Sequence, residues 1–411
     1  MKRCFYLLVA IFLICTGLAS ATWQRVAELT LPNCSGCVAS VAVSPSGNTV
    51  VIGGAPPAKS LSLFAKPAAG WSNASNPTLL ETSDQSIFAF GEGTHGVETN
   101  DTTVIGEAFQ YIGTSSIERQ VLLVWQEPAN GWASQTVVKT SFVLSIPSPY
   151  IWGLEALWGG MAVNDETIVV GARSELNQQG AIYVWNNPPQ RSAPIARLAA
   201  SDGMPAHQLG YSLSISGDTI AAGSCPIAGY GNGAVYIFQK PAQGWKSGTQ
   251  TAKLTYPADG PTGFGCFTAS SNDTIASGVP SYNDDDGRVD IFSKPPSGWA
   301  DSSTPTAEIG ASLKTGGFFG GTANLGTSIS GDTMLVASAA YINTEDSAEN
   351  IFYEPDGGWN SKQQPDATID ILNPQHFNMN GRDGAGTNIM VIPNCSTPNG
   401  FGSPISVYQD E

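Results

Sequence analysis

Residues 216–222 read SGDTIAA, a polar turn followed by an apolar run. The same pattern recurs at 46–52, 100–105, 164–170, 271–277, 330–337 and, in a degraded form, 387–392. Neighbouring copies stand 52 to 65 residues apart. Because a period of this length is the signature of a repeat architecture, the chain is predicted to consist of seven similar units.

A second pattern has the same period. An apolar run ends in an aromatic residue, two further residues and a proline, at 64–67, 125–128, 185–188, 238–241, 292–295 and 352–355. Proline cannot donate to a sheet, so it ends each strand. In five units a Gly-Trp pair and a short alternating stretch follow, with the tryptophans Trp71, Trp132, Trp245, Trp299 and Trp359. Each unit therefore holds four strands.

In the fourth unit these strands are A (211–216), B (219–223), C (234–238) and D (251–255). A single sheet of this kind cannot bury both of its faces, so neighbouring units must cover them. The predicted fold is all-β, a seven-bladed β-propeller of four-stranded blades, with the recurring tryptophan packed between blades.

The two ends of the chain complete this prediction. The seventh unit stops after a C strand at 405–408, and its D strand is missing. Residues 23–29 carry the missing pattern, with Trp23 in the register that Trp245 has before strand D. We expect the N-terminal strand to complete the last blade, which closes the ring and removes an exposed sheet edge.

The start of the chain has the features of a secretion signal. Basic residues at 2–3 precede an apolar run at 5–14 and a small-residue triplet that ends at Ala21. Residues 1–21 are predicted to be a signal peptide and residues 22–411 a single propeller domain. The apolar run is shorter than the roughly 20 residues that span a membrane. The predicted location is secreted, or periplasmic in a Gram-negative host.

The chain is acidic, with 18 Lys and Arg against 34 Asp and Glu and a net charge of −16. Such a surface repels nucleic acid and anionic membranes, so neither is an expected partner. The expected state is a monomer without membrane insertion.

Five cysteines follow the predicted signal peptide: Cys34, Cys37, Cys225, Cys266 and Cys395. Cys225 follows strand B of unit four and Cys266 opens unit five, while Cys395 and Cys37 have the same places in units seven and one. B–C loops and D–A loops share one face of a propeller. The register predicts disulfides Cys225–Cys266 and Cys37–Cys395, with Cys34 left over or exchanging with Cys37.

Short motifs in register with these units resemble the FG-GAP repeat family, which includes the head of integrin α subunits. They are Phe90-Gly91, Phe264-Gly265 and Phe319-Gly320, the variants Trp158-Gly159 and Leu209-Gly210, and Gly54-Ala55-Pro56 with the variants Gly171-Ala172 and Gly278-Val279-Pro280. The resemblance covers the chain after residue 21. It implies a binding or adhesion function.

The resemblance also implies calcium, because integrin members hold the ion in acidic loops between strands A and B. Here those turns are short, and we expect no cofactor. The one acidic cluster, Asp284, Asp285 and Asp286 with Asp290 beyond it, falls in a B–C loop. A solvated turn is preferred there, with a calcium site as the alternative.

No nucleophile elbow, zinc-binding helix or phosphate loop is present in the sequence. The histidines His95, His207 and His376 fall in loops before strand A, in three different units. We therefore expect a non-catalytic secreted binding or adhesion protein that presents one propeller face to a protein or carbohydrate.

Candidate ligand-binding residues are the aromatics of the D–A and B–C loops: Tyr150, Trp152, Trp158, Tyr230 and Tyr282. The alternative is a polysaccharide-acting hydrolase or lyase. It requires paired carboxylates at the channel mouth, drawn from Asp202, Glu155 or Asp284.

Overall fold

The computed structural model describes residues 23–31, 40–53, 60–88, 96–111, 118–134, 136–145, 159–226, 232–257, 262–283, 286–310, 327–338, 347–371, 389–393 and 405–410. Helical structure in these ranges is limited to η1 (Trp132–Ser134) and α1 (Glu175–Gln178). The all-β prediction is confirmed. None of the helices in these ranges has the length and apolarity needed to cross a membrane.

The described strands form seven sheets, numbered first to seventh in the order of the units. The first holds β2 (Ser40–Val43), β3 (Thr49–Gly53), β4 (Ser60–Ala65) and β5 (Thr78–Glu81); the second β6 (Ile87–Phe88), β7 (Val97–Thr99), β8 (Thr103–Tyr111), β9 (Glu118–Gln126) and β11 (Phe142–Ser145). The third holds β12 (Met161–Val163), β13 (Thr167–Gly171), β14 (Ile182–Asn186) and β15 (Ala196–Ala199); the fourth β16 (Leu209–Ser216), β17 (Thr219–Ser224), β18 (Ala234–Gln239) and β20 (Ala252–Thr255).

The remaining sheets repeat the pattern. The fifth holds β21 (Thr268–Ser271), β22 (Thr274–Val279), β23 (Arg288–Ser293) and β24 (Ala307–Ile309); the sixth β25 (Thr327–Ser330), β26 (Thr333–Ser338), β27 (Ser347–Tyr353) and β28 (Ala367–Ile371); the seventh β29 (Ile389–Pro393), β30 (Ile405–Asp410) and β1 (Trp23–Leu29). In the fourth, fifth and sixth sheets, four antiparallel strands follow one another in chain order, as predicted.

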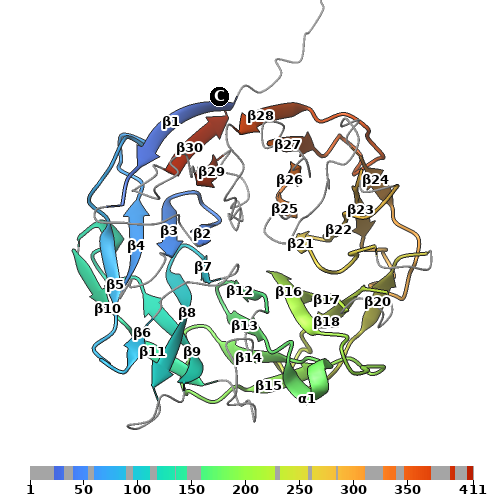
Figure 1. Cartoon of the computed structure of the whole chain (residues 1–411), viewed down its shortest axis with the longest axis horizontal. Helices are drawn as coiled ribbons and strands as arrows, with labels where there is room; N and C mark the ends of the chain where they lie inside the picture. Colours follow the sequence, from blue (N-terminus) through green and yellow to red (C-terminus); the bar gives the residue numbers. More distant parts are fainter. Residues whose placement is uncertain are drawn as a thin grey trace, which may run out of the picture.

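The sheets are disposed around a common centre and follow the chain from the first to the seventh (Figure 1). The strands nearest this centre are β2, β7, β12, β16, β21 and β25, the A strands of six units (Figure 1). The outermost strands come from the end of each unit. Strand order within a unit therefore sets the distance of each side chain from the centre.

The first described strand pairs with the last. β1 lies antiparallel to β30, with Trp23 opposite Asp410 and Leu29 opposite Ile405. Trp23 also donates its indole N–H to the hydroxyl of Tyr353 in the sixth sheet, at 2.9 Å. The predicted completion of the last sheet by residues 23–29 is confirmed.

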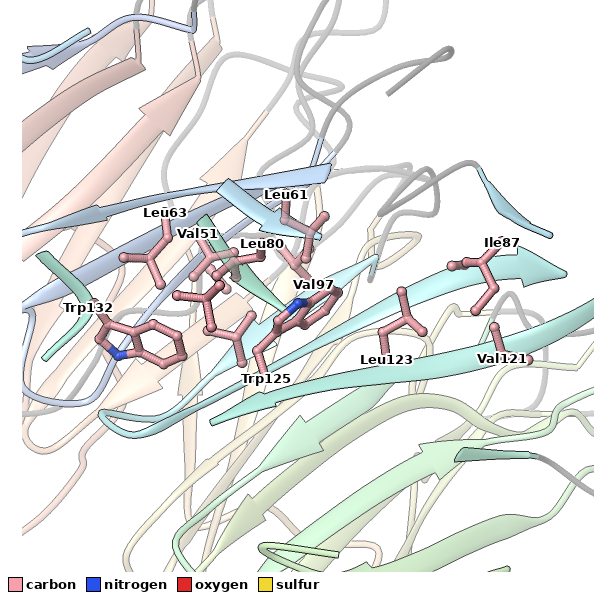
Figure 2. Packing of buried hydrophobic residues seen from close by; sticks show 14 residues of the cluster. Val51, Leu61, Leu63, Leu80, Ile87, Val97, Val121, Leu123, Trp125 and Trp132 are labelled. Carbon is pink, nitrogen blue, oxygen red and sulfur yellow. The ribbon is translucent and has the colours of Figure 1, made fainter. Parts of the chain in front are cut away.

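The recurring tryptophans pack between sheets. Trp132 is buried in one cluster with Leu61, Leu63 and Leu80 of the first sheet and Leu123 and Trp125 of the second (Figure 2). The other four occupy the corresponding seams, Trp71 between the seventh and first sheets, Trp245 between the third and fourth, Trp299 between the fourth and fifth, and Trp359 between the fifth and sixth. The predicted role of all five is confirmed.

A second seam contact follows each of these tryptophans. The chain after the tryptophan crosses to the preceding sheet and pairs in parallel with its outermost strand. The pairs are Ala74 with Leu29, β10 (Val137–Lys139) with β5, β19 (Gly248–Thr249) with β15, Ser302 with Leu254 and Lys362 with Ile309. In these five sheets the edge strand is thus contacted by the next unit, which hinders edge pairing with another molecule there.

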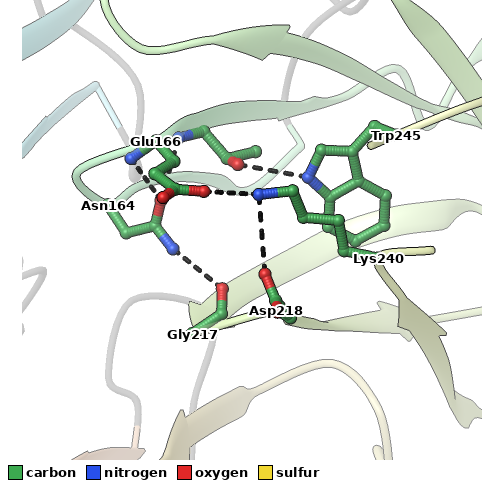
Figure 3. A network of polar contacts seen from close by, with 7 residues as sticks. Asn164, Glu166, Gly217, Asp218, Lys240 and Trp245 are labelled. Carbon is green, nitrogen blue, oxygen red and sulfur yellow. Dashed lines mark hydrogen bonds and ion pairs between the residues drawn. The ribbon is translucent and has the colours of Figure 1, made fainter. Parts of the chain in front are cut away.

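The turns between strands A and B hold the sheets together near the centre. The Asn164 side chain accepts from the backbone N–H of Thr167 at 2.9 Å and donates to the carbonyl of Gly217 in the fourth sheet, also at 2.9 Å (Figure 3). Lys240 of the fourth sheet reaches Glu166 of the third at 2.5 Å (Figure 3). Asn164, the polar residue that opens the A–B turn of the third sheet, therefore links this sheet to the fourth.

Replacement of Trp132 by alanine should destabilise the protein by about 3–5 kcal/mol, because the side chain is 2% exposed and leaves a cavity between two sheets. Urea unfolding of the Trp132→Ala variant measures this loss. Met204→Ala is the control, since Met204 is 56% exposed and should change stability by no more than about 0.5 kcal/mol. Equal losses in the two variants would contradict packing between sheets as the source of stability.

Candidate functional site

Two classes of loop share one end of the sheets. Strands A and B form an antiparallel hairpin, so the B–C and D–A loops lie at the end opposite to the A–B turns. Cys225, after β17, is bonded to Cys266, before β21, with 4.6 Å between their Cα atoms. This predicted disulfide is confirmed. The predicted partner pair Cys37 and Cys395, with Cys34, lies outside the described residues.

The same two loop classes meet between the third and fourth sheets, where hydrogen bonds take the place of the disulfide. Asn177, Gln178 and Gln179 offer their carbonyls to the backbone N–H groups of Ala206, Gln208 and Leu209, at 3.1, 2.7 and 2.9 Å. Leu176, Asn177 and Gln178 all have a positive φ, which is unfavourable for these residues. The docking of the two loops therefore outweighs a local backbone cost.

An aromatic platform, defined as Tyr256, Tyr282 and Arg288, lies on this end of the fifth sheet. The guanidinium carbon of Arg288 is 4.5 Å from the centre of the Tyr282 ring and 5.3 Å from that of Tyr256. Arg288 is thus in contact with both rings, an arrangement stabilised by the attraction between a cation and an aromatic face. Tyr282 is 38% exposed, so its ring is available to a ligand.

Two carboxylates neutralise Arg288. Its Nε is 2.7 Å from Oδ1 of Asp290 and its Nη1 is 2.8 Å from Oε1 of Glu308. Arg288 and Asp290 are two residues apart on β23, so their side chains share one face of the strand. Asp290 is completely buried, and burial raises the pKa of its carboxyl to about 6 against the opposing effect of Arg288. The platform therefore presents the Tyr282 ring to a ligand, while the charge of Arg288 is already paired.

The platform is anchored in the core. The ring centres of Tyr256 and Phe264 are 6.4 Å apart. Those of Phe264 and Phe292 are 6.1 Å apart, in an edge-to-face arrangement. Phe264 is fully buried beside the disulfide residue Cys266. The rings of Phe264 and Tyr256 cannot move without disturbing the core. Arg288 lies against Tyr256, so the exposed ring of Tyr282, which contacts Arg288, is held on a rigid support.

In the third and fourth sheets, the positions equivalent to Asp290 and Glu308 of the fifth hold a tyrosine opposite a basic residue, and both contact one carboxylate. In the third sheet Tyr183 donates to Glu175 at 2.8 Å, and Arg197 contacts the same carboxylate at 2.6 Å. In the fourth, Tyr236 donates to Asp202 at 3.0 Å and Lys253 contacts it at 2.6 Å. The register places Tyr183 opposite Arg197, Tyr236 opposite Lys253 and Asp290 opposite Glu308. Among the described residues, only the fifth sheet also has an exposed aromatic ring stacked on its charged side chain, Tyr282 on Arg288.

The predicted binding residues have different outcomes. Tyr282 lies in the platform, whereas Tyr150, Trp152, Trp158 and Tyr230 lie outside the described residues. Sequence reasoning missed Tyr256 and Arg288. Tyr256 lies just beyond the end of β20, and Arg288 lies at the start of β23 opposite Val279 of β22, so neither occupies a position that the repeat pattern marks.

The acidic cluster is divided. Asp290 is paired with Arg288 in the interior, and Asp286 accepts from the Asn283 side chain at 2.8 Å. Asp284 and Asp285 lie outside the described residues. In the ranges that the structure describes, no three His, Cys, Asp or Glu side chains come together as a set of metal ligands.

The family model for the FG-GAP repeat matches residues 194–238, which run from β15 through β18. The chain therefore contains an FG-GAP repeat at residues 194–238, and the match is to the repeat itself and not to integrin α subunits. No curated protein matches the chain.

The stability of the protein should depend on pH through Asp290. Its pKa is about 6 in the folded state, while an unfolded aspartate titrates near about 3.9. Between these values the folded state binds more protons, so stability rises as the pH falls from about 6 to about 4. The difference in unfolding free energy between the native chain and Asp290→Asn should change by about 2 kcal/mol across this window. Parallel curves would show that Asp290 does not titrate there.

The disulfide should stabilise the platform end of the fourth and fifth sheets. Joint replacement of Cys225 and Cys266 by serine should lower the free energy of unfolding by about 2–4 kcal/mol, because the bridge closes a loop with a sequence separation of 41. Urea unfolding with and without a reductant measures the loss. The reductant should lower the stability of the native chain by more than that of the double variant, in which the predicted Cys37–Cys395 bridge remains to be reduced; equal effects on the two chains would show that the Cys225–Cys266 bridge does not stabilise the fold.

Proposed function

We propose that this chain is a secreted, non-catalytic binding or adhesion protein, built as a closed seven-bladed β-propeller, that presents its B–C and D–A loops to a protein or carbohydrate ligand. Seven sheets around a common centre and the pairing of β1 with β30 support the closed ring (Figure 1). The Cys225–Cys266 disulfide and the FG-GAP repeat are typical of extracellular proteins, which supports secretion.

The observation that carries the proposed function is the exposed Tyr282 ring stacked on Arg288. A tyrosine ring offers a large apolar face and loses little conformational freedom on binding, because its support is already ordered. Arg288 is paired with Asp290 and Glu308, so the ring is the part of the platform left for a ligand. The flat apolar face of a sugar and an aliphatic side chain of a protein are both suitable partners.

The alternative, a polysaccharide-acting hydrolase or lyase, requires two carboxylates about 5 to 10 Å apart. Of its three candidate acids, Asp202 is engaged by Tyr236 and Lys253. Glu155 and Asp284 lie outside the described residues. A turnover assay on the same glycans that bind would separate an enzyme from a binding protein.

Screening the full chain on glycan and extracellular-protein arrays provides the ligand, and titration of variants then tests the platform. Tyr282→Ala should weaken binding about tenfold or more, because the stacking surface is lost. Tyr282→Phe keeps the ring and should bind within a few-fold of the native chain. Tyr111→Ala is the matched control, since Tyr111 is an exposed tyrosine of the second sheet. Unchanged binding by Tyr282→Ala would contradict the proposal.

A further inference from the structure

A cavity of about 260 Å³ lies among the innermost strands of the sheets. Its described lining comes from six sheets, through β2, β7, β12, β16, β21 and β25, the strands nearest the centre in Figure 1. Pro45, Gly217 and Asn272 of the A–B turns also line it. The cavity is therefore at the end of the sheets opposite to the aromatic platform, and none of its lining residues belongs to the platform.

The register explains why the centre is open and polar. Glu98, Ser214 and Ser328 occupy equivalent positions on their A strands, opposite Ile105, Ala221 and Leu335 of the B strands. Ala162 and Ala269 hold the same position in the third and fifth sheets. The alanines and serines at this position are short, which leaves space beside the inner strands, and several of the side chains that line it carry hydroxyls.

The hydrogen bonds between sheets leave donors in this cavity. Oγ of Ser214 accepts from the backbone N–H and from the hydroxyl of Ser270, at 2.9 and 2.8 Å. Oγ of Ser271 accepts from the backbone N–H of Gly331 at 2.9 Å. A hydroxyl has one donor and two acceptor positions, so Ser214 and Ser271 each keep an O–H to donate.

Acceptors line the same cavity. The Glu98 carboxylate, which is 7% exposed, is part of the lining, and a carboxylate has about four lone-pair positions, so it can accept from several donors at once. A cavity for a cation needs only acceptors, and a cavity for an anion needs only donors. An anion would also meet Glu98 and a net charge of −16. A set that combines donors and acceptors matches a ligand whose own groups both donate and accept, which is the chemistry of a polyol.

We propose that this central cavity binds one ring of a neutral saccharide, with Ser214 and Ser271 donating to its hydroxyls and Glu98 accepting from them. The volume lies just under the range of about 300–1,000 Å³ that holds drug-sized ligands, which suits a single sugar ring. The apolar side chains Val43, Val163 and Ile215, which also line the cavity, provide surface for the C–H face of the ring.

Calorimetric titration of the full chain with a panel of neutral methyl hexosides tests the site, with glycerol, methylammonium chloride and sodium phosphate as competing probes. At least one hexoside should bind, and it should bind more tightly than glycerol, methylammonium or phosphate. Ser214→Ala should weaken that binding about fivefold to tenfold, because one hydrogen bond is lost. Glu98→Gln, which keeps the shape but replaces one acceptor oxygen by a donor, should also weaken it.

Ala162→Leu should abolish binding by filling the cavity, and its melting temperature shows whether the fold is kept. Ser302→Ala removes a hydroxyl far from the cavity, and Tyr282→Ala removes the platform; both should bind the hexoside like the native chain. Loss of array ligands in Tyr282→Ala with hexoside binding kept would establish two separate sites. The proposal is overturned if no hexoside binds at millimolar concentration, if methylammonium or phosphate binds more tightly, or if Ser214→Ala and Glu98→Gln bind unchanged.

Discussion

Every sheet of this protein must bury two apolar faces, and the rest of the structure depends on that constraint. Strands such as β3, β13, β17 and β22 are buried at every position, so neither face of these sheets can be left in water. Neighbouring sheets provide that cover, because the described residues contain almost no helix. The seam clusters that contain Trp71, Trp132, Trp245, Trp299 and Trp359 are the result.

The packing between neighbouring sheets also determines where functional groups can lie. Apolar side chains take up the space between sheets, which leaves the loops at one end and the small inner residues at the centre. The aromatic platform uses the first location, with the buried rings of Phe264 and Phe292 as its support. The central cavity uses the second, where short side chains such as Ala162 and Ser214 line the space beside the inner strands. Both locations result from the way in which the sheets pack against one another.

The sequence was informative where a feature repeats and uninformative where it does not. The period predicted the strands, the place of the tryptophans, the pairing of residues 23–29 and the Cys225–Cys266 bridge, because each follows from register alone. Arg288 could not be placed in the same way, since its contact with Tyr282 depends on the conformation of one B–C loop. The parallel pairing of β10 with β5 was also missed, because a crossing to the preceding sheet leaves no pattern of its own.

The antiparallel pairing of β1 with β30 has a mechanical consequence. Trp23 lies opposite Asp410, so the first residue of β1 and the last residue of β30 lie at the same end of the seventh sheet. Tension between these two points would peel the hydrogen bonds apart one after another, whereas strands pulled from opposite ends would share the force across all of them. The resistance of this sheet to being opened must therefore come from side chains such as Ala27, Leu29 and Trp71, which have to be withdrawn from a packed seam into water.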